Sequence, residues 1–406
     1  MAEVPVIQVL NKKDYFKQAL VPIPDPLPPL GESSLRIRTD VLALTSNNFT
    51  YCKLADLADW WGIHRIPPTT PAPYNDTSVY GRISAWGFAK VVDSTFPSVP
   101  KGRYVWGYLP IGTLPQDFQV KEAGLPGQFF VTEPYRKNHL KLYNHYFVCP
   151  EGIEHAIAGK ADVIAYGALF RVMHLTAWIM AEFMFSPDPK QSVNLTPEQA
   201  DLTDATVISF APGSKVGLAF AHALRQRTAS KPARIVGAAS EHSQAFVKGT
   251  GFYDAVEPTS ADPVEVASRL GVSKKDGKIV IVDFGGRNHV QWKWAEALVS
   301  AYPRVQFVSV GAEVSEPSAA IAPGGKPPAG LDIAQVMADT QQNQAIEKVG
   351  EVEYWTRNDA AWDTFWKAGI PGVKLVWGEG MEAVKDAWDR FARGEVSSEE
   401  ALVFKV

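Results

Sequence analysis

The residue order of one stretch in the second half of the chain, residues 205–224, suits the binding of a phosphate. An apolar run rich in β-branched side chains (206–210) leads into small residues (211–214), and helix formers without proline follow. This order predicts a strand, a tight turn and a helix. The first N–H groups of a helix have no intrahelical acceptor, and the helix dipole favours an anion beside them. The stretch is therefore a candidate pyrophosphate-binding turn.

The glycines of this turn match a dinucleotide-binding fingerprint only in part. In that fingerprint three glycines serve the turn itself, the approach of the phosphate, and the packing of helix against sheet. Gly217 suits the packing role and Gly213 the close approach, but Pro212 and Ser214 stand where further glycines are expected. We predict a cofactor site at Gly213, Ser214, Lys215, Val216 and Gly217.

Lys215 places a positive charge inside the turn. It is either a direct phosphate contact or a solvated loop lysine. We favour the contact because a cation near two phosphates strengthens their binding. The position of its ammonium group in the fold decides between the two interpretations.

The end of the next predicted strand, residues 233–239, indicates the type of nicotinamide cofactor. An NAD site needs a carboxylate there for the ribose 2′-hydroxyl, whereas a small residue with a hydrogen-bond donor leaves room for a 2′-phosphate. The strand is followed directly by Ser240, which favours NADP(H) with Ser240 as a contact. Glu241, one position later, argues in the opposite direction.

A second candidate group, Asn47, Asn48 and Tyr51, follows a predicted strand in the first half of the chain. A phenol can donate a proton to a developing enolate or alkoxide, and amides can hold the oxygen that receives it. We therefore predict Tyr51 as a proton donor, helped by Asn47 or Asn48. The stretch 45–52 fits either a pocket wall or an ordinary loop whose asparagines bond to their own backbone, and both interpretations stay open.

Four large aromatic residues are candidates for a substrate pocket: Trp60, Trp61, Trp86 and Tyr143. They favour an apolar substrate, with an aromatic one as the preferred kind. An ordinary core would bury such tryptophans as well, and tyrosine is also common as a partly buried structural residue.

The composition argues against several classes of function. The 406 residues carry a formal net charge of −4 without a long run of one sign, so neither a nucleic acid nor a membrane is expected as a partner. The two cysteines cannot form a disulfide framework or a four-thiolate zinc site, and no histidine pair has helical spacing. No Gly-x-Ser-x-Gly elbow is present. We expect a cytoplasmic protein with a small-molecule substrate and no metal, and we leave a homodimer open.

Hydrophobic patterning predicts two kinds of structure along the chain. The first part carries four strand candidates, at 6–9, 34–44, 82–93 and 102–108. Residues 112–146 are predicted to be irregular, and residues 161–185 to be helical.

Beyond the turn, apolar strands alternate with short helices up to about residue 311. This alternation predicts a parallel sheet covered on both faces. The predicted fold class is therefore α/β. A doubly wound, Rossmann-type cofactor-binding domain is expected at 165–312, and a β-rich, barrel-like catalytic domain at 1–164 and 313–406.

Four short patterns follow one another along the chain: Gly102-Arg-Tyr-Val-Trp-Gly107, Leu175-Thr-Ala-Trp178, Asp283-Phe-Gly-Gly286 and Val308-Ser-Val-Gly311. In the same order, they are similar to motifs of the zinc-independent, quinone/enoyl reductase-like branch of the medium-chain dehydrogenase/reductase superfamily. The resemblance extends over nearly the whole chain. It implies the two-domain fold and a nicotinamide cofactor, with Gly285 among the residues that contact it.

The sequence also departs from the zinc-dependent members of that superfamily. Where they carry Gly-His-Glu, this chain has Ala85-Trp86-Gly87, so Trp86 takes the place of the histidine ligand and a catalytic zinc is not expected. Other patterns, such as Gly251-Phe-Tyr-Asp254, resemble a sub-branch of microbial and fungal proteins usually labelled as of unknown function.

Three hypotheses of function follow. The first is an NADP(H)-dependent oxidoreductase that reduces a carbonyl, quinone or enone of an apolar small molecule, in a cleft between the sheet's carboxyl edge and the β-rich domain. The second keeps the fold but uses the cleft for the acid–base chemistry of a lyase, hydrolase or cyclase. The third is a non-catalytic, cofactor-sensing protein.

Overall fold

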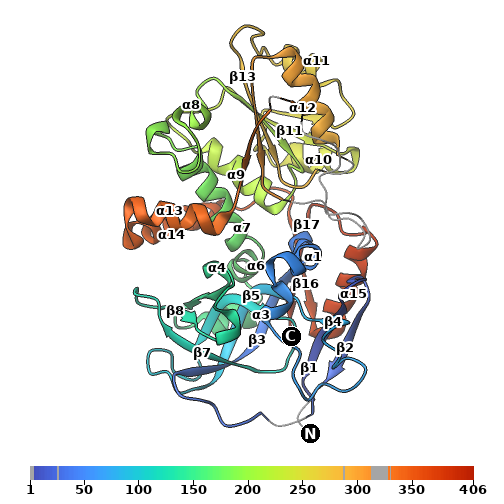
Figure 1. Ribbon diagram of the computed structural model, residues 1–406, viewed down its shortest axis with the longest axis vertical. Coiled ribbons are helices and arrows are strands. Elements are labelled where there is room, and N and C mark those ends of the chain that lie inside the picture. The colour runs from blue at the N-terminus through green and yellow to red at the C-terminus, as the bar shows by residue number, and fades with distance from the viewer. Residues whose placement is uncertain (1–3, 25–26, 287–288, 312–327, 330) are drawn as a thin grey trace.

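A six-stranded parallel sheet forms one half of the molecule (Figure 1). The computed structural model describes residues 4–24, 27–286, 289–311, 328–329 and 331–406. The strand order is β12-β11-β10-β13-β14-β15, the order of a doubly wound dinucleotide-binding sheet. Its strands are β10 (Thr206–Phe210), β11 (Arg234–Ala239), β12 (Ala255–Pro258), β13 (Lys278–Asp283), β14 (Arg304–Ser309) and β15 (Asp332–Gln335). The predicted doubly wound domain is confirmed.

Both faces of this sheet are buried under helices. Val207 belongs to the core cluster that includes α9, whereas Ile208 belongs to the cluster on the side of α11 and α12. Successive strand residues point to opposite faces, so a sheet covered twice needs continuous apolar strands. The helices are α9 (Lys215–Arg225), α10 (Glu241–Gly249), α11 (Pro263–Arg269) and α12 (Val290–Ala301).

The other half of the molecule is an eight-stranded, mostly antiparallel sheet in the order β16-β17-β3-β5-β6-β9-β8-β7. An additional pairing of β3 with β7 curls it into a barrel, as predicted. Its strands are β3 (Ser34–Leu44), β5 (Ser84–Ser94), β6 (Tyr104–Pro110), β7 (Gln116–Glu122), β8 (Gln128–Val131), β9 (His145–Val148), β16 (Lys374–Glu379) and β17 (Glu400–Lys405).

Two parts of the sequence interpretation differ from the structure. Residues 112–146, predicted to be irregular, contain β7, β8 and the start of β9, which pair with one another and with the distant strands β3 and β6. The predicted domain limit at residue 312 falls before β15, which nevertheless joins the parallel sheet beside β14.

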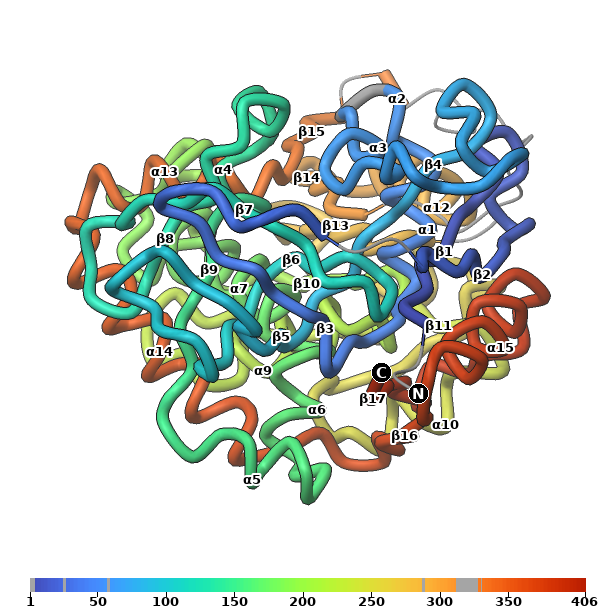
Figure 2. Tube along the Cα trace, turned by 90° about the horizontal axis from the view of Figure 1, so that it is seen from below, coloured from blue at the N-terminus to red at the C-terminus, as the bar shows by residue number. Residues whose placement is uncertain are grey.

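A small third sheet extends the barrel at its side. It consists of β1 (Val6–Asn11), β2 (Gln18–Pro22) and β4 (Tyr80–Gly81). The late helix α15 (Gly380–Ala392) lies against β2, so two ends of the chain's described part pack together (Figures 1 and 2). Trp388 anchors this contact, because its Nε1 donates to the carbonyl of Tyr15 at 3.0 Å.

Helical segments join the two halves. The main connection runs through α5 (Ile153–Ala158), α6 (Asp162–Leu169), α7 (Arg171–Ile179) and a π-helical turn, η2 (Met180–Met184). Beside α7 lie α13 (Ala338–Val349) and α14 (Glu351–Ala368) (Figure 1). Shorter elements are α1 (Ser46–Lys53), α2 (Ala55–Ala58), α3 (Trp60–Ile63), α4 (Lys141–Asn144), α8 (Pro197–Ala200), η1 (Pro134–Arg136) and η3 (Pro189–Gln191).

Within the described ranges, no single helix has the length and apolar character needed to cross a membrane. The helical segments Asp162–Leu169 and Arg171–Met184 have that length and apolar character only when they are taken together, and a bend of 57° separates them. Most of the pair's residues belong to the main buried core cluster of the molecule.

Candidate functional site

Helix α1 positions the predicted proton donor. Thr45 follows β3 and caps the helix, and its own backbone N–H donates to Asn48 Oδ1 at 2.8 Å in a capping box. Asn48 Nδ2 also donates to the carbonyl of Ser84 on β5 at 2.9 Å. Residues 45–52 are therefore a helix packed on the barrel and not a loop, and Asn48 is committed to holding it there.

The Tyr51 hydroxyl is the centre of a hydrogen-bond cluster. Asn47 Nδ2 donates to it at 2.6 Å and Trp86 Nε1 at 3.1 Å. Burial raises the pKa of Tyr51 to about 12, although these bonds and one with Tyr143 oppose the shift. Tyr51 therefore keeps its proton across the neutral range, while its oxygen already has the donors that would stabilise a phenolate.

Three of the four predicted aromatic residues gather around Tyr51. Its ring centroid lies 5.0 Å from Trp60 and 5.9 Å from Tyr143, and Trp86 reaches its hydroxyl. The Tyr143 hydroxyl interacts with both Tyr51 and Trp60, and burial raises its pKa well above the usual value. Trp61 does not join this group, because its ring packs on Gly81 of β4 and under the ammonium group of Lys12.

A small cavity opens beside Tyr51. One wall comes from β3, α1 and β5, and the facing wall from α6 and α7. The sequence predicted only a helix over residues 161–185 here, because an apolar helix face carries no local signal that separates a core residue from a residue of a pocket wall. The lining residues are Ala43, Thr45, Asn47, Asn48, Tyr51, Trp86, Ala168, Leu169, Val172 and Met173.

Trp86, which the sequence resemblance predicts in place of a zinc-binding histidine, is buried in the barrel. Its ring is 4% exposed and stacks on Trp106, with centroids 4.9 Å apart and planes 24° apart. In the part of the chain that the structure describes, no group of three or more His, Cys, Asp or Glu side chains could hold a metal ion. The indole instead supplies an N–H donor to Tyr51.

We expect the two asparagines of α1 to respond differently to substitution. Asn48→Leu leaves the Thr45 N–H and the Ser84 carbonyl without their partner, and should lower the free energy of unfolding by about 1–3 kcal/mol. Asn47→Leu removes one donor to a hydroxyl that keeps Trp86 and should cost about 1 kcal/mol or less. Urea unfolding of both variants measures the difference, and equal losses would contradict the separate roles.

The turn after β10 has the geometry of an anion site at a helix start. Ser214 caps α9, since its Oγ accepts from the N–H of Gly217 at 3.1 Å. Among the described residues, the N–H groups of Lys215 and Val216 have no acceptor. Two free N–H groups at the start of an 11-residue helix fit a phosphate group.

Backbone approaches around the turn are close. A Cβ on Gly217 would lie 2.9 Å from Ser214 Oγ and 3.1 Å from the carbonyl oxygen of Ala211, and one on Gly213 would lie 3.2 Å from Ser398 Cβ. The hydroxyl of Tyr253, from the Gly251–Asp254 pattern, lies 2.9 Å from the carbonyl of Pro212. The sequence alone did not indicate that Tyr253 supports the turn after β10.

The ammonium group of Lys215 is bound by the other half of the molecule. Its Nζ donates to the carbonyls of Ser398 and Glu400, both at 2.9 Å. Ser398, just before β17, and Glu400, the first residue of β17, thus bind the charge that was predicted to contact phosphate. The side chain is therefore not a solvated loop lysine in this structure, and it joins α9 to the barrel.

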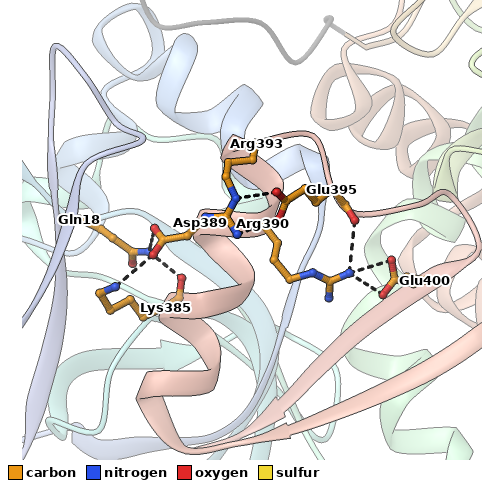
Figure 3. Close-up of polar contacts among 7 residues, drawn as sticks. All are labelled: Gln18, Lys385, Asp389, Arg390, Arg393, Glu395 and Glu400. Atoms are coloured by element: carbon orange, nitrogen blue, oxygen red, sulfur yellow. Dashed lines mark hydrogen bonds and ion pairs between the residues drawn. The ribbon is translucent and has the colours of Figure 1, made fainter.

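A network on α15 holds the carbonyls that bind Lys215 in place (Figure 3). Arg390 donates to both carboxylate oxygens of Glu400 at 2.8 and 3.1 Å. The same helix is tied to β2, because Gln18 Nε2 donates to Asp389 and to the carbonyl of Lys385. The carbonyls that receive Lys215 are therefore fixed by contacts across the barrel.

Burial lowers the pKa of Lys215 from 10.5 to about 8. Between these values the unfolded chain binds more protons than the folded one, so the contribution of Lys215 to stability rises with pH from about 8 to about 10.5. We expect the melting temperature of wild type minus that of Lys215→Met to increase over this range. Lys248→Met, at an exposed lysine of α10, is the control, and a difference independent of pH would contradict the argument.

The remaining predicted cofactor residues lie at the carboxyl ends of neighbouring strands. Ser240 follows β11, is exposed, and has its Oγ 3.1 Å from Ser243 Oγ. Gly285 follows β13 with φ of +118°, a conformation that favours glycine, and its N–H donates to Asp283 Oδ1 at 2.9 Å. Both positions border the edge of the sheet where the turn after β10 lies.

Comparison with known proteins gives one family and many similar folds. The family described as "Protein of unknown function (DUF2855)" matches residues 42–397. No curated protein matches the sequence. A mutant form of enoyl thioester reductase from Candida tropicalis is 11% identical over 100% of both chains, with a TM-score of 0.56.

Two further solved structures are similar to this chain. CurA from Vibrio vulnificus in complex with NADPH is 11% identical, with 96% of this chain and 94% of that chain covered and a TM-score of 0.55. The CurK enoyl reductase is 13% identical over 99% of both chains, with a TM-score of 0.54. The chain thus belongs to the family described as "Protein of unknown function (DUF2855)", and it shares the two-domain fold of the enoyl reductases named above.

Proposed function

We propose that the protein is an NADP(H)-dependent oxidoreductase that reduces a carbonyl, quinone or enone of an apolar small molecule. The observation that carries this proposal is the Tyr51 hydroxyl, which receives N–H donors from Asn47 and Trp86 at the wall of a cavity. Reduction of such a substrate needs a proton for its oxygen or for the adjacent carbon. A neutral phenol at a largely apolar wall is suited to supply it.

The turn after β10 would bind the pyrophosphate of the cofactor through the N–H groups of Lys215 and Val216. Gly213, Ser214 and Gly217 would keep the backbone close to it. The cofactor, when bound, supplies the hydride. Support comes from the free N–H groups and from the fold shared with CurA, which was solved with NADPH.

Tyr51 would give its proton to the substrate as negative charge develops on the substrate oxygen. The phenolate that remains would keep the N–H donors of Asn47 and Trp86, and these hydrogen bonds strengthen as the acceptor becomes charged. Tyr143 would return a proton to Tyr51 through the contact between their hydroxyls. The facing residues Val172 and Met173 would exclude water and favour an apolar substrate.

The choice of cofactor tests this proposal directly. We expect wild type to bind NADPH more tightly than NADH, measured by cofactor fluorescence and by the shift in melting temperature. Ser240→Asp places a carboxylate where the 2′-phosphate would lie, so it should weaken NADPH binding about ten-fold or more and spare NADH. Ser240→Ala, which removes only a hydroxyl, should weaken NADPH binding only a few-fold.

The proposal would lose its basis if neither cofactor changed the fluorescence or the melting temperature at concentrations well above micromolar. If both Ser240 variants changed NADPH and NADH affinity equally, the redox function would still stand, but the assignment of Ser240 to the 2′-phosphate would be contradicted.

A further inference from the structure

The barrel covers one side of the turn after β10. Gly213 is buried, and a Cβ built on it would lie 3.2 Å from the Cβ and 3.4 Å from the Oγ of Ser398. Ser398 belongs to residues 397–400, which lead from α15 into β17, and we call this stretch the covering segment. Gly213 is the position predicted to allow the close approach of a phosphate. Ser398 therefore stands where a phosphate would come close to the turn.

Lys215 fastens the covering segment to helix α9. Its Nζ donates to the carbonyls of Ser398 and Glu400, both of which belong to the segment. An ammonium group has three N–H donors, and the segment takes two of them. The backbone N–H of the same lysine has no acceptor in the described part of the chain. The turn thus offers a free N–H and a positive charge, and the covering segment binds the charge.

The covering segment keeps its shape through bonds within the barrel. Arg390 donates to both carboxylate oxygens of Glu400 (Figure 3), and the N–H of Ser397 donates to Glu400 Oε2 at 3.0 Å. The N–H of Lys374 on β16 donates to the carbonyl of Glu399 at 2.9 Å. Because these bonds do not involve α9, the segment can leave the turn as a unit once Lys215 releases it.

A phosphate is a stronger partner for Lys215 than the covering segment is. The two carbonyl oxygens carry no net charge, whereas the pyrophosphate of a dinucleotide is negative, so attraction between opposite charges adds to its hydrogen bonds. A pyrophosphate at the free N–H groups of Lys215 and Val216 would lie at the base of the Lys215 side chain. It would compete with the carbonyls for the ammonium group and with Ser398 for the space at Gly213.

We propose that the covering segment closes the phosphate turn in the cofactor-free protein, and that NADP(H) binds only to a form in which the segment has moved off the turn. This inference rests on the proposed binding of NADP(H) there. In the closed form Lys215 holds the parallel-sheet half against the barrel, and in the open form its ammonium group contacts the pyrophosphate. Because only the open form binds, the closed form lowers the apparent affinity.

Variants that loosen the covering segment test the proposal by the direction of their effect. Arg390→Met removes two bonds that shape the segment, and Ser398→Gly removes the side chain beside Gly213. Since both favour the open form, each should tighten NADPH binding about three-fold or more in fluorescence titrations of the full chain. Arg393→Met is the matched control on α15, because Arg393 pairs with Glu395 outside the segment, and it should bind NADPH as wild type does.

The outcomes separate this inference from the proposed function. If wild type binds NADPH and the two loosened variants bind it equally or more weakly, the covering segment does not close the turn and the inference is wrong, while the redox function stands. If only the two loosened variants bind NADPH, the segment closes the turn almost completely. If none of the four proteins binds it, the proposed function fails and the inference fails with it.

Thermal unfolding without cofactor measures the role of Lys215 in the closed form. Lys215→Met is expected to change the melting temperature of wild type. This change should fall to about half or less when Arg390→Met is already present, because the carbonyls that receive Lys215 are then no longer fixed. In the Arg393→Met background the change should stay as large as in wild type. A change of the same size in all three backgrounds, or no change in any, would show that Lys215 does not act through the covering segment and would overturn the inference.

Discussion

Replacing Tyr51 by phenylalanine is expected to lower kcat for reduction of a working substrate by about 100-fold or more, with little change in cofactor affinity. A positioned general acid contributes on the order of 10²–10⁴ to the rate of a proton-transfer step. The ring of Tyr51 packs against Trp60, Tyr108 and Tyr143, and a phenylalanine keeps these contacts. The loss should therefore appear in turnover and not in folding.

Two further measurements isolate the role of the Tyr51 proton. Since burial raises the pKa of Tyr51 to about 12, kcat should show no deprotonation of this group between neutral pH and about pH 10. Tyr143→Phe removes only the group that would return the proton, so its effect on kcat should be smaller. Unchanged turnover in Tyr51→Phe on a substrate that wild type reduces would show that another group donates the proton.

Replacing Gly217 by alanine is expected to weaken NADPH binding about ten-fold or more. The new methyl group would lie 2.9 Å from Ser214 Oγ, which is too close, and 3.1 Å from the carbonyl oxygen of Ala211, which is a tight contact. The Ser214 hydroxyl would have to leave the N–H of Gly217, and the turn would move away from the helix start. Loss of the cap alone should lower stability by about 0.5–2 kcal/mol.

Gly249 on α10 provides the matched control for this substitution. An added Cβ there meets no atom within 4 Å, so Gly249→Ala should leave NADPH binding unchanged and keep or raise the melting temperature. Fluorescence titration and thermal unfolding of the two variants give the comparison. Equal NADPH affinity in Gly217→Ala and wild type would place the cofactor's phosphates away from this turn.

The elements that the sequence predicted well are those with a local signal. The predicted alternation of apolar strands and short helices beyond the turn is present as β11, α10, β12, α11, β13, α12 and β14. Their hydrophobic period and their flanking glycines and prolines are written in consecutive residues. In contrast, β7 and β8 were missed, because both are short and are stabilised by pairing with each other and with β3 and β9.

The candidate site residues also fall into those that the structure brings together and those that it does not. The sequence pointed to Tyr51, Asn47 and Trp86, and the fold brings them to one oxygen atom. It also pointed to Trp61, whose type matches that of Trp60 but whose ring packs on another sheet. Adjacent residues on a short helix point in different directions, and residue type alone does not say which one reaches the cavity.

By itself, the sequence determined the doubly wound domain, the barrel, the phosphate-type turn after β10 and the phenol of Tyr51, because these depend on short patterns of apolar, small and polar residues. The tertiary structure decided which groups these residues meet. Lys215 is bound by carbonyls 183 and 185 positions away, and Tyr51 by an indole 35 positions away. Such contacts depend on how complete elements pack against each other, and no local pattern encodes that packing.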